Sequence, residues 1–215
     1  MKHRKGAPLI ATLSIALAAG CSFLSPRPDP TKFYVLTATA GADSTTSVRN
    51  SASHVAIGLG PVKLPDYLAH AEVVTRAAPN RLELSATDRW AEPLDESFRR
   101  VLARNLATLL GTDQVMPFPW DPSVALDYKI EVTVGHFERD ASGGTQLAAG
   151  WIIRDGHDNR LLLSGKANFA ESASGGMEGA ATALSADLSD FSKQLADAII
   201  ELSRAHRPRA AMQTD

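Results

Sequence analysis

The one cysteine of this 215-residue chain, Cys21, lies where its thiol could take up a lipid. It follows the run Leu17-Ala18-Ala19-Gly20, whose small side chains allow an extended chain to enter a peptidase cleft. A sulfur nucleophile directly after such a run can carry a diacylglycerol thioether. The alternative is an ordinary secretion signal with a cysteine nearby. The residue types and their order predict that Cys21 is the lipid-attachment residue.

The residues before Cys21 have the features of a cleaved signal peptide. A basic start, residues 2–5, precedes an apolar stretch at 7–19. This stretch is too short for a transmembrane helix, which needs about 20 apolar residues. The whole matches the bacterial lipobox pattern and predicts a signal peptide at 1–20, with the acylated Cys21 as the first mature residue. A single acyl chain binds a protein to a membrane only marginally, whereas two or more acyl chains make the attachment effectively permanent.

Residues 21–32 are expected to be a lipidated tether. Ser22 follows the cysteine, and lipoproteins of Gram-negative bacteria that lack Asp at this position usually go to the outer membrane. Pro26, Pro28 and Pro30 restrict the backbone and make a semi-stiff spacer. We therefore expect the folded part to lie close to the periplasmic face of the outer membrane, anchored through Cys21.

The charge balance argues against a nucleic-acid partner. Removal of residues 1–20 takes away three of the 22 Lys and Arg and none of the 24 Asp and Glu, which leaves a net charge near minus five. Nucleic-acid binding would need clustered basic residues on one face. With Cys21 used for lipid, the folded part has no disulfide to form.

The remaining residues that could do chemistry do not form a catalytic or metal-binding pattern. The mature histidines are scattered, without the four-residue helical spacing that places two imidazoles on one metal. The chain has no serine-hydrolase elbow and no phosphate-binding loop. Asp155, His157 and Asp158 could hold a cation, but such clusters are more often turns. We expect a non-enzymatic protein with no cofactor and no metal. The scattered histidines of the mature chain are His54, His70, His136, His157 and His206.

Hydrophobic periodicity indicates strands and two helices. Apolar residues at helical spacing predict one helix at 94–110, between Pro93 and Gly111, and another at 184–202. Alternating or β-branched runs predict the strands, with a hairpin around 77–80, a three-stranded meander from 126 to 169 and a loop at 41–53. The predicted strands are 33–37, 55–61, 72–76, 81–85, 126–134, 146–154 and 161–169.

This set of elements predicts the fold class and the domain organisation. We expect a single α/β domain at 33–205, with a mixed, largely antiparallel sheet covered by two long amphipathic helices in a sandwich. A flexible, polar tail follows at 206–215. No internal repeat or second domain is evident.

Two tryptophans are candidates for a partner interface. Trp90 lies just before Pro93, and an indole at that position more often clamps the start of a helix in the core. Trp120, between Pro119 and Asp121 in a predicted loop, is as well suited to binding as to packing.

Arginines in and just after the predicted hairpin are the other candidates. Arg76 and Arg89, with Arg81, could form a basic patch for lipid headgroups or an acidic partner. The commoner role of such arginines is pairing with local acids, here Glu83 and Asp88.

Several segments taken together resemble the ABC-type transport auxiliary lipoproteins, the PqiC family. They are the lipobox ending at Cys21, Phe33-Tyr34-Val35-Leu36, Ile57–Val62, Asn80–Glu83 and Arg89–Leu94. The resemblance extends from about Phe33 to Leu202. The chain departs from the expected pattern at Ala69-His70, where an aromatic or basic residue would follow Tyr67-Leu68. The resemblance therefore assigns no role to these residues.

The resemblance implies a fold and a role. Family members are similar in fold to the amino-terminal domain of the TolB translocation protein. They act with MCE-domain (PqiB-like) proteins that carry lipids between the two membranes of Gram-negative bacteria, often powered by an inner-membrane ABC ATPase. For this chain the resemblance implies a non-enzymatic docking subunit at the outer membrane in phospholipid transport.

One alternative function is a stand-alone, membrane-tethered lipid carrier or chaperone, which would need an apolar cavity able to hold an acyl chain. The predicted apolar stripes are only wide enough to close one core. A remote hydrolase would need a perturbed acid or base in a cleft, and the sequence offers no candidate. A homo-oligomer, such as a ring, is also possible, because the sequence does not indicate the number of subunits.

Overall fold

The computed structural model describes residues 28–41 and 54–206. The chain divides into two units, Met1–Pro30 and Thr31–Asp215, and only residues 28–30 of the first unit are described. The predicted signal peptide, the predicted lipid site Cys21 and most of the predicted loop at 41–53 therefore lie outside the described residues, as does the tail beyond His206.

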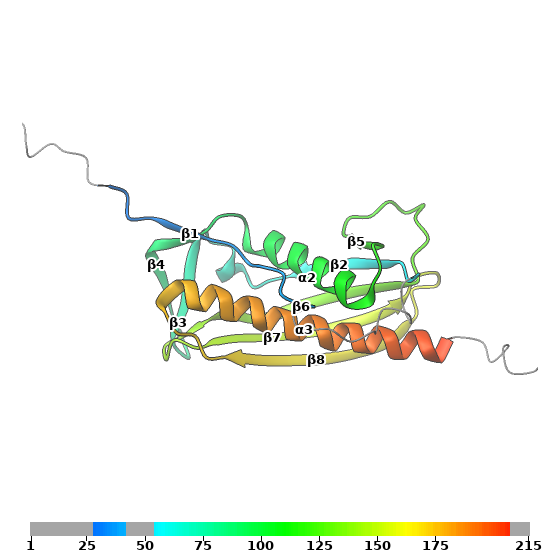
Figure 1. Cartoon of the computed structure of the whole chain (residues 1–215). Helices are drawn as coiled ribbons and strands as arrows, with labels where there is room; N and C mark the ends of the chain where they lie inside the picture. The colour runs from blue at the N-terminus through cyan, green and yellow to red at the C-terminus, as the bar shows by residue number, and fades with distance from the viewer. Residues whose placement is uncertain (1–27, 42–53, 207–215) are drawn as a thin grey trace, which may run out of the picture. The chain divides into compact units, whose positions relative to one another are not determined.

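The second unit consists of strands and two long helices (Figure 1). The helices are α2 (Leu94–Leu110) and α3 (Gly176–His206), and one short 3-10 turn, η2, spans Asp66–Leu68. The strands are β1 (Lys32–Tyr34), β2 (Ile57–Lys63), β3 (Glu72–Ala78), β4 (Arg81–Trp90), β5 (Val115–Pro117), β6 (Tyr128–Asp140), β7 (Thr145–Asp155) and β8 (Leu161–Glu171).

All eight described strands belong to one mixed sheet that branches at β6. One edge of β6 pairs in parallel with β2 and, further along, with β3, while its other edge pairs with β7 in antiparallel fashion. The path continues outward to β5 beyond β2 and to β4 and β1 beyond β3. The longest pairings, β6 with β7 and β7 with β8, are antiparallel. The predicted α/β class with a mixed sheet and two long helices is confirmed.

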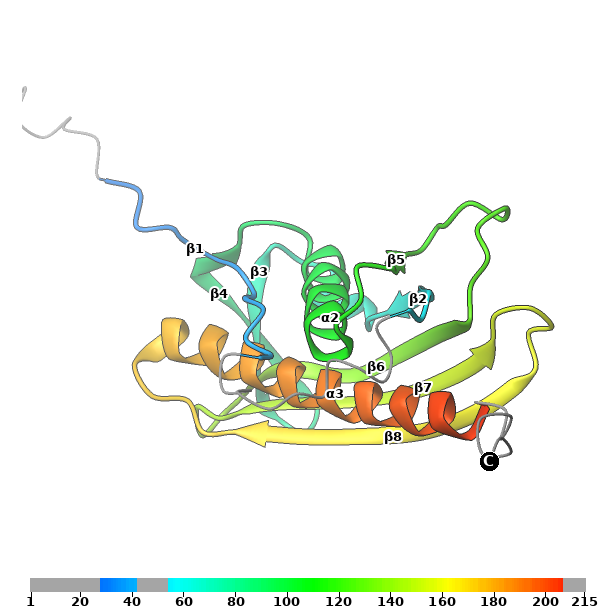
Figure 2. The same ribbon diagram turned by 45° about the vertical axis from the view of Figure 1, so that its right-hand side comes forward.

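The two helices lie together on one face of the sheet (Figure 2). Helix α2 begins after Pro93, as expected, and ends at Gly111, whose positive φ of 66° suits a residue without a Cβ. In the part of the chain that the structure describes, no helix has an apolar stretch sufficient to cross a membrane.

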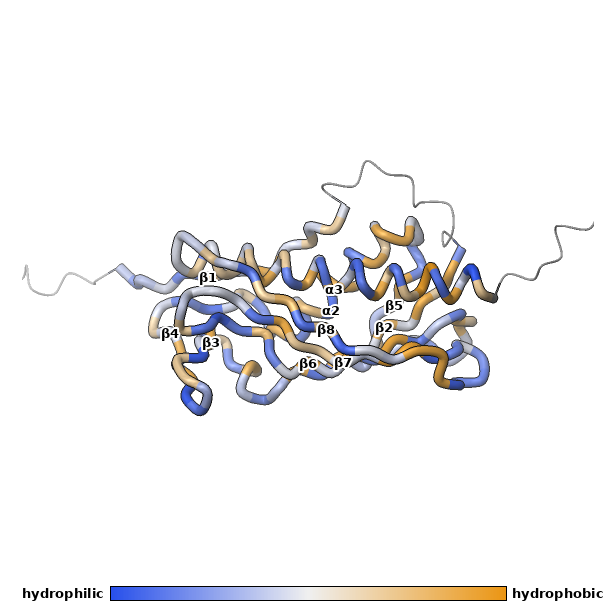
Figure 3. The backbone as a smooth tube through the Cα atoms, turned by 90° about the horizontal axis from the view of Figure 1, so that it is seen from below, coloured by the Kyte–Doolittle hydropathy of each residue, from blue (hydrophilic) through white to orange (hydrophobic). Residues whose placement is uncertain are grey.

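Apolar side chains from both helices and the sheet form the core. Phe98 of α2 makes an edge-to-face contact with Phe137 of β6, with ring centroids 5.1 Å apart, and also meets Phe191 of α3. Apolar and polar residues alternate along the strands and recur at helical intervals along α3 (Figure 3). Burial of one face of each element drives this packing.

One close contact between the neighbouring strands β7 and β8 requires a glycine. The Trp151 ring lies over Gly165 of the neighbouring strand, and a Cβ on Gly165 would stand 2.4 Å from Trp151 Cζ2. Only a glycine leaves room for the indole at this point.

Several element boundaries differ from the sequence prediction. The first strand ends at Tyr34, although a strand over 33–37 was expected, because the chain then leaves β4 to cross the helices. β5 and η2 were not predicted: both are three residues long, and Pro117 interrupts the strand pattern. Helix α3 begins at Gly176 and not at 184, since its first turns bury small alanines in place of large apolar residues.

Candidate interaction surfaces

The segment that follows the predicted tether is fixed across both helices. The Ala91 amide donates to the Tyr34 carbonyl at 2.9 Å, and the Thr37 amide donates to Ser185 Oγ of α3 at 3.1 Å. Further on, the Ala40 amide donates to Asn105 Oδ1 of α2 at 3.2 Å. These long-range hydrogen bonds give residues 32–40 a defined path.

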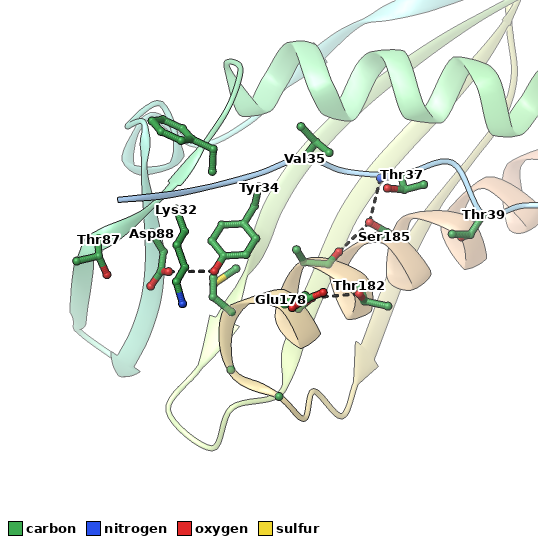
Figure 4. Close-up of a pocket in the computed structure, with 15 residues that line it drawn as sticks. Lys32, Tyr34, Val35, Thr37, Thr39, Thr87, Asp88, Glu178, Thr182 and Ser185 are labelled. Carbon is green, nitrogen blue, oxygen red and sulfur yellow. Dashed lines mark hydrogen bonds between the residues drawn. The ribbon is translucent and has the colours of Figure 1, made fainter. Parts of the chain in front are cut away.

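A groove of about 970 Å³ lies between this segment, the end of β4 and the first turns of α3 (Figure 4). We call it the β1–α3 groove. Its lining combines the Lys32 ammonium with the carboxylates of Asp88 and Glu178 and several hydroxyl groups. The Tyr34 hydroxyl donates to Asp88 Oδ1 at 3.1 Å, and burial together with this carboxylate raises the pKa of Tyr34. The groove thus combines charged and hydroxyl groups with the apolar side chains of Phe33, Val35 and Met177.

This groove was not predicted from the sequence. The feature that could have indicated it is the uninterrupted apolar and aromatic run Phe33-Tyr34-Val35-Leu36. Leu36 is buried and Tyr34 is half-buried, whereas Phe33 is 65% exposed and Val35 is 51% exposed. A strand with apolar residues on both faces, of which only one is covered, presents an apolar surface to its surroundings.

A second apolar surface is formed by the loop between β5 and β6. Phe118 is 45% exposed and meets Trp120 edge-to-face at 5.3 Å between ring centroids. The half-buried Trp120 packs onto Gly58 of β2, where a Cβ would lie 3.1 Å from the indole. The Phe118 amide donates to the Leu59 carbonyl at 2.8 Å. We call Phe118, Trp120 and the neighbouring exposed Val124 the β5–β6 aromatic surface.

One sequence candidate, Trp90, does not present a free surface. Trp90 is only 6% exposed and belongs to the core, so we remove it from the candidate interface. Its position at the end of β4, directly before α2, is that of a clamp on the start of the helix.

The arginines do not form a basic patch. Arg76 Nε lies 2.7 Å from Oε1 of the buried Glu138, and Arg89 pairs with Glu72 at 3.2 Å. Pairing with local acids was the commoner role considered. Glu83 pairs with Arg81 at 3.4 Å, while Asp88 accepts hydrogen bonds from the hydroxyl groups of Tyr34 and Ser85. Arg76 and Arg89 lie opposite different residues of the hairpin, Leu82 and Glu72. Each charge is therefore neutralised separately.

Arg76 belongs to a buried polar cluster on β3, β6 and η2. Glu138 accepts hydrogen bonds from Arg76 Nε, the Tyr67 hydroxyl and the Phe137 amide, and lies 2.8 Å from His136 Nδ1. Burial alone would raise the pKa of Glu138, but these hydrogen bonds together lower it. Burial and the nearby carboxylate raise the pKa of Tyr67 to about 12. Because all these groups satisfy one another, the cluster stabilises the fold and offers no free acid or base.

One buried carboxylate is incompletely satisfied. Asp187 of α3 accepts a hydrogen bond from Thr145 Oγ1 at 2.7 Å, while its Oδ1 has no hydrogen-bond partner among the described residues. Burial raises the pKa of Asp187 to about 6, and the carboxylates of Glu171 and Asp190 add to this effect. Through its hydrogen bond to Thr145, this carboxylate faces β7 of the sheet.

The cluster at 155–159 is a turn. Asp155 Oδ1 accepts hydrogen bonds from the amides of His157 and Asp158, and Asn159 has a φ of 60°. Within residues 28–41 and 54–206, no group of three or more His, Cys, Asp or Glu side chains is arranged to hold a metal ion.

Comparisons with known proteins agree on one family. The family model described as "ABC-type transport auxiliary lipoprotein component" matches residues 34–196. The chain is 27% identical over 153 residues to the "Intermembrane transport lipoprotein PqiC" of Escherichia coli K12, covering 71% of this chain and 76% of that protein. The Shigella flexneri protein of the same name matches equally.

Among solved structures, the fold is similar to a crystal structure of a protein from Xanthomonas campestris. That match has a TM-score of 0.68 at 16% sequence identity and covers 81% of this chain and 98% of the other. At this level of identity the likeness concerns the fold alone.

Proposed function

Since the chain belongs to the ABC-type transport auxiliary lipoprotein family, we propose that it is an outer-membrane-anchored, non-enzymatic docking subunit of an MCE-type intermembrane phospholipid transport system. In this proposal residues 1–20 are a signal peptide, residues 21–32 form a tether acylated at Cys21, residues 33–205 form the docking domain and residues 206–215 form a tail. The direct partner is an MCE-domain (PqiB-like) protein that works with an ABC ATPase or permease system.

The observation that carries the proposal is the position of the β5–β6 aromatic surface. The loop that bears Phe118 and Trp120 lies at the opposite end of the domain from β1, the strand that follows the proposed tether (Figures 1 and 2). A protein anchored at one end and presenting an aromatic pair at the other is suited to hold a second protein away from the membrane. Tryptophan and other aromatic anchors dominate the binding energy of many interfaces.

The composition of the grooves favours docking over the alternative, a stand-alone lipid carrier. A carrier needs an apolar cavity that encloses acyl chains. The β1–α3 groove is lined by Lys32, Asp88 and Glu178 and by several hydroxyl groups, in addition to the apolar side chains of Phe33, Val35 and Met177. These charges would be costly to bury against an acyl chain.

Site-specific photo-crosslinking in cells tests the proposal. A benzoylphenylalanine at position 118 should crosslink to an MCE-domain protein, and the same probe at Leu84, which is similarly exposed at 50%, should not. Phe118→Ser should weaken retention of that partner by about 30-fold, the loss typical of a hot-spot residue, without affecting the fold.

Three other outcomes would contradict the proposal. Equal crosslinking from both positions would mean that the aromatic surface has no special role. A crosslink to a second copy of this chain would assign the surface to a homo-oligomer. Stoichiometric phospholipid without any protein partner would favour the lipid carrier.

A further inference from the structure

The strand next to the tether has an uncovered apolar face. Phe33 and Val35, two residues apart, are both more than half exposed, whereas Leu36 is buried and Tyr34 extends into the β1–α3 groove toward Asp88 (Figure 4). Leu36 is 2% exposed, against 65% for Phe33 and 51% for Val35. The buried side accounts for the position of the segment, but nothing in the described structure accounts for apolar residues on its outer side.

The segment cannot turn this face inward. Its backbone is bonded to α3 through Ser185, to α2 through Asn105 and to the residue after β4 through Ala91. Rotation of Phe33 and Val35 into the core would also expel Leu36. The apolar face is therefore a fixed feature of the surface.

The length of the tether indicates what covers this face. Phe33 is 12 residues from Cys21, so even a fully extended tether, at about 3.5 Å per residue, keeps it within roughly 40 Å of the lipid-bearing sulfur. A short tether of this kind gives an effective concentration in the millimolar range. If Cys21 is acylated, the bilayer interface is the apolar phase that Phe33 and Val35 meet most often.

The charges beside this face suit a zwitterionic lipid headgroup. Lys32 offers a cation to a phosphate, and Glu178 and Asp88 offer carboxylates to an ammonium group along the same groove. A purely anionic headgroup would meet both carboxylates unfavourably. Phosphatidylethanolamine carries both charges that the β1–α3 groove can match.

We propose that Phe33 and Val35 insert into the headgroup layer of the membrane that holds the lipid anchor, with a phosphatidylethanolamine headgroup accommodated in the β1–α3 groove. This inference rests on the anchoring part of the proposed function. It assigns the β1 end of the domain to the membrane and leaves the β5–β6 aromatic surface free for a protein partner.

A single-label quenching experiment tests the inference. Because Cys21 is the only cysteine and is acylated in the mature protein, Phe33→Cys introduces a unique thiol for an environment-sensitive NBD label. Leu161→Cys is the matched control, since Leu161 is 53% exposed and opens β8 at the other end of the domain (Figure 2). Acylated full-length proteins are reconstituted into vesicles of phosphatidylethanolamine and phosphatidylglycerol that contain a headgroup-level nitroxide lipid.

We expect the label at position 33 to be quenched at least threefold more than the label at 161. We also expect Lys32→Glu to reduce this quenching, because the phosphate then loses its cation. Equal quenching at both positions would overturn the inference. A blue-shifted but unquenched label at 33 would show that protein, such as a second copy, covers the face, and would overturn it as well.

Mass measurement of the intact protein separates this failure from that of the proposed function. An unacylated protein would remove the anchor, and the inference would fall with it. An acylated protein without quenching at position 33 would refute the membrane contact alone and leave the docking role standing.

Discussion

Replacement of Asp187 by asparagine should remove a pH-dependent destabilisation of the fold. In the folded protein, burial raises the pKa of Asp187 to about 6 from its ordinary value of 3.8. Between these two pH values the folded state binds more protons at this site than the unfolded state does. Stability from this group therefore falls as the pH rises from about 4 to about 6, and above that the full penalty persists.

The magnitude follows from the size of the shift. A difference of about two pH units at about 1.4 kcal/mol per unit corresponds to about 3 kcal/mol. An asparagine at 187 cannot ionise, and its side-chain oxygen can still accept the hydrogen bond from Thr145 Oγ1. Because the unfolded-state carboxylate is already partly ionised at pH 4, we expect the free energy of unfolding of Asp187→Asn, relative to that of wild type, to increase by about 2.5 kcal/mol between pH 4 and pH 7.

Urea unfolding of both proteins at a series of pH values measures this difference. Titration of the other carboxylates, including Glu138 with its lowered pKa, is common to both proteins and cancels in the comparison. Asp197→Asn, at an exposed position of the same helix, is the control and should give a difference that changes little with pH. A difference between wild type and Asp187→Asn that stays constant from pH 4 to pH 7 would refute the reasoning.

Two further substitutions test the packing and the buried ion pair, each by urea unfolding at neutral pH. Arg76→Leu should cost about 3 kcal/mol, because it leaves the Glu138 carboxylate buried without its cation, whereas Arg81→Leu, in an exposed pair, should cost less than about 1 kcal/mol. Equal costs would mean that the Arg76 pair acts as a surface pair. Gly165→Ala should cost about 1–3 kcal/mol, since its Cβ would collide with Trp151, whereas Gly150→Ala, with no atom within 4 Å of the new Cβ, should be nearly neutral. A neutral Gly165→Ala would show that the indole can move aside.

The elements that the sequence predicted well are those with strong local signals. Helix α2 lies between Pro93 and Gly111 as expected, because its apolar period, its proline and its left-handed glycine all agree. The meander from β6 to β8 was predicted for the same reason, since alternation and turn residues point to one structure.

The parts that could not be predicted depend on contacts between distant residues. Arg76 pairs with Glu138, 62 residues away, and no local pattern indicates that partner in place of Glu83. The first turns of α3 escaped prediction because glycines and alanines give no hydrophobic period, although Ala180 and Ala181 are buried. The outward face of Phe33 and Val35 could not be told from the inward face of Tyr34 and Leu36, because all four are apolar or aromatic.

The measurement that tests the central claim most directly is affinity purification of the acylated full-length protein from detergent-solubilised cell envelopes, with mass spectrometry of the proteins and lipids that copurify. The account predicts an MCE-domain protein in near-stoichiometric amount with the wild type, and its loss with Phe118→Ser while the fold is retained. Stoichiometric phospholipid without an MCE-domain protein, or an MCE-domain protein retained undiminished by Phe118→Ser, would contradict the docking role assigned to the β5–β6 aromatic surface.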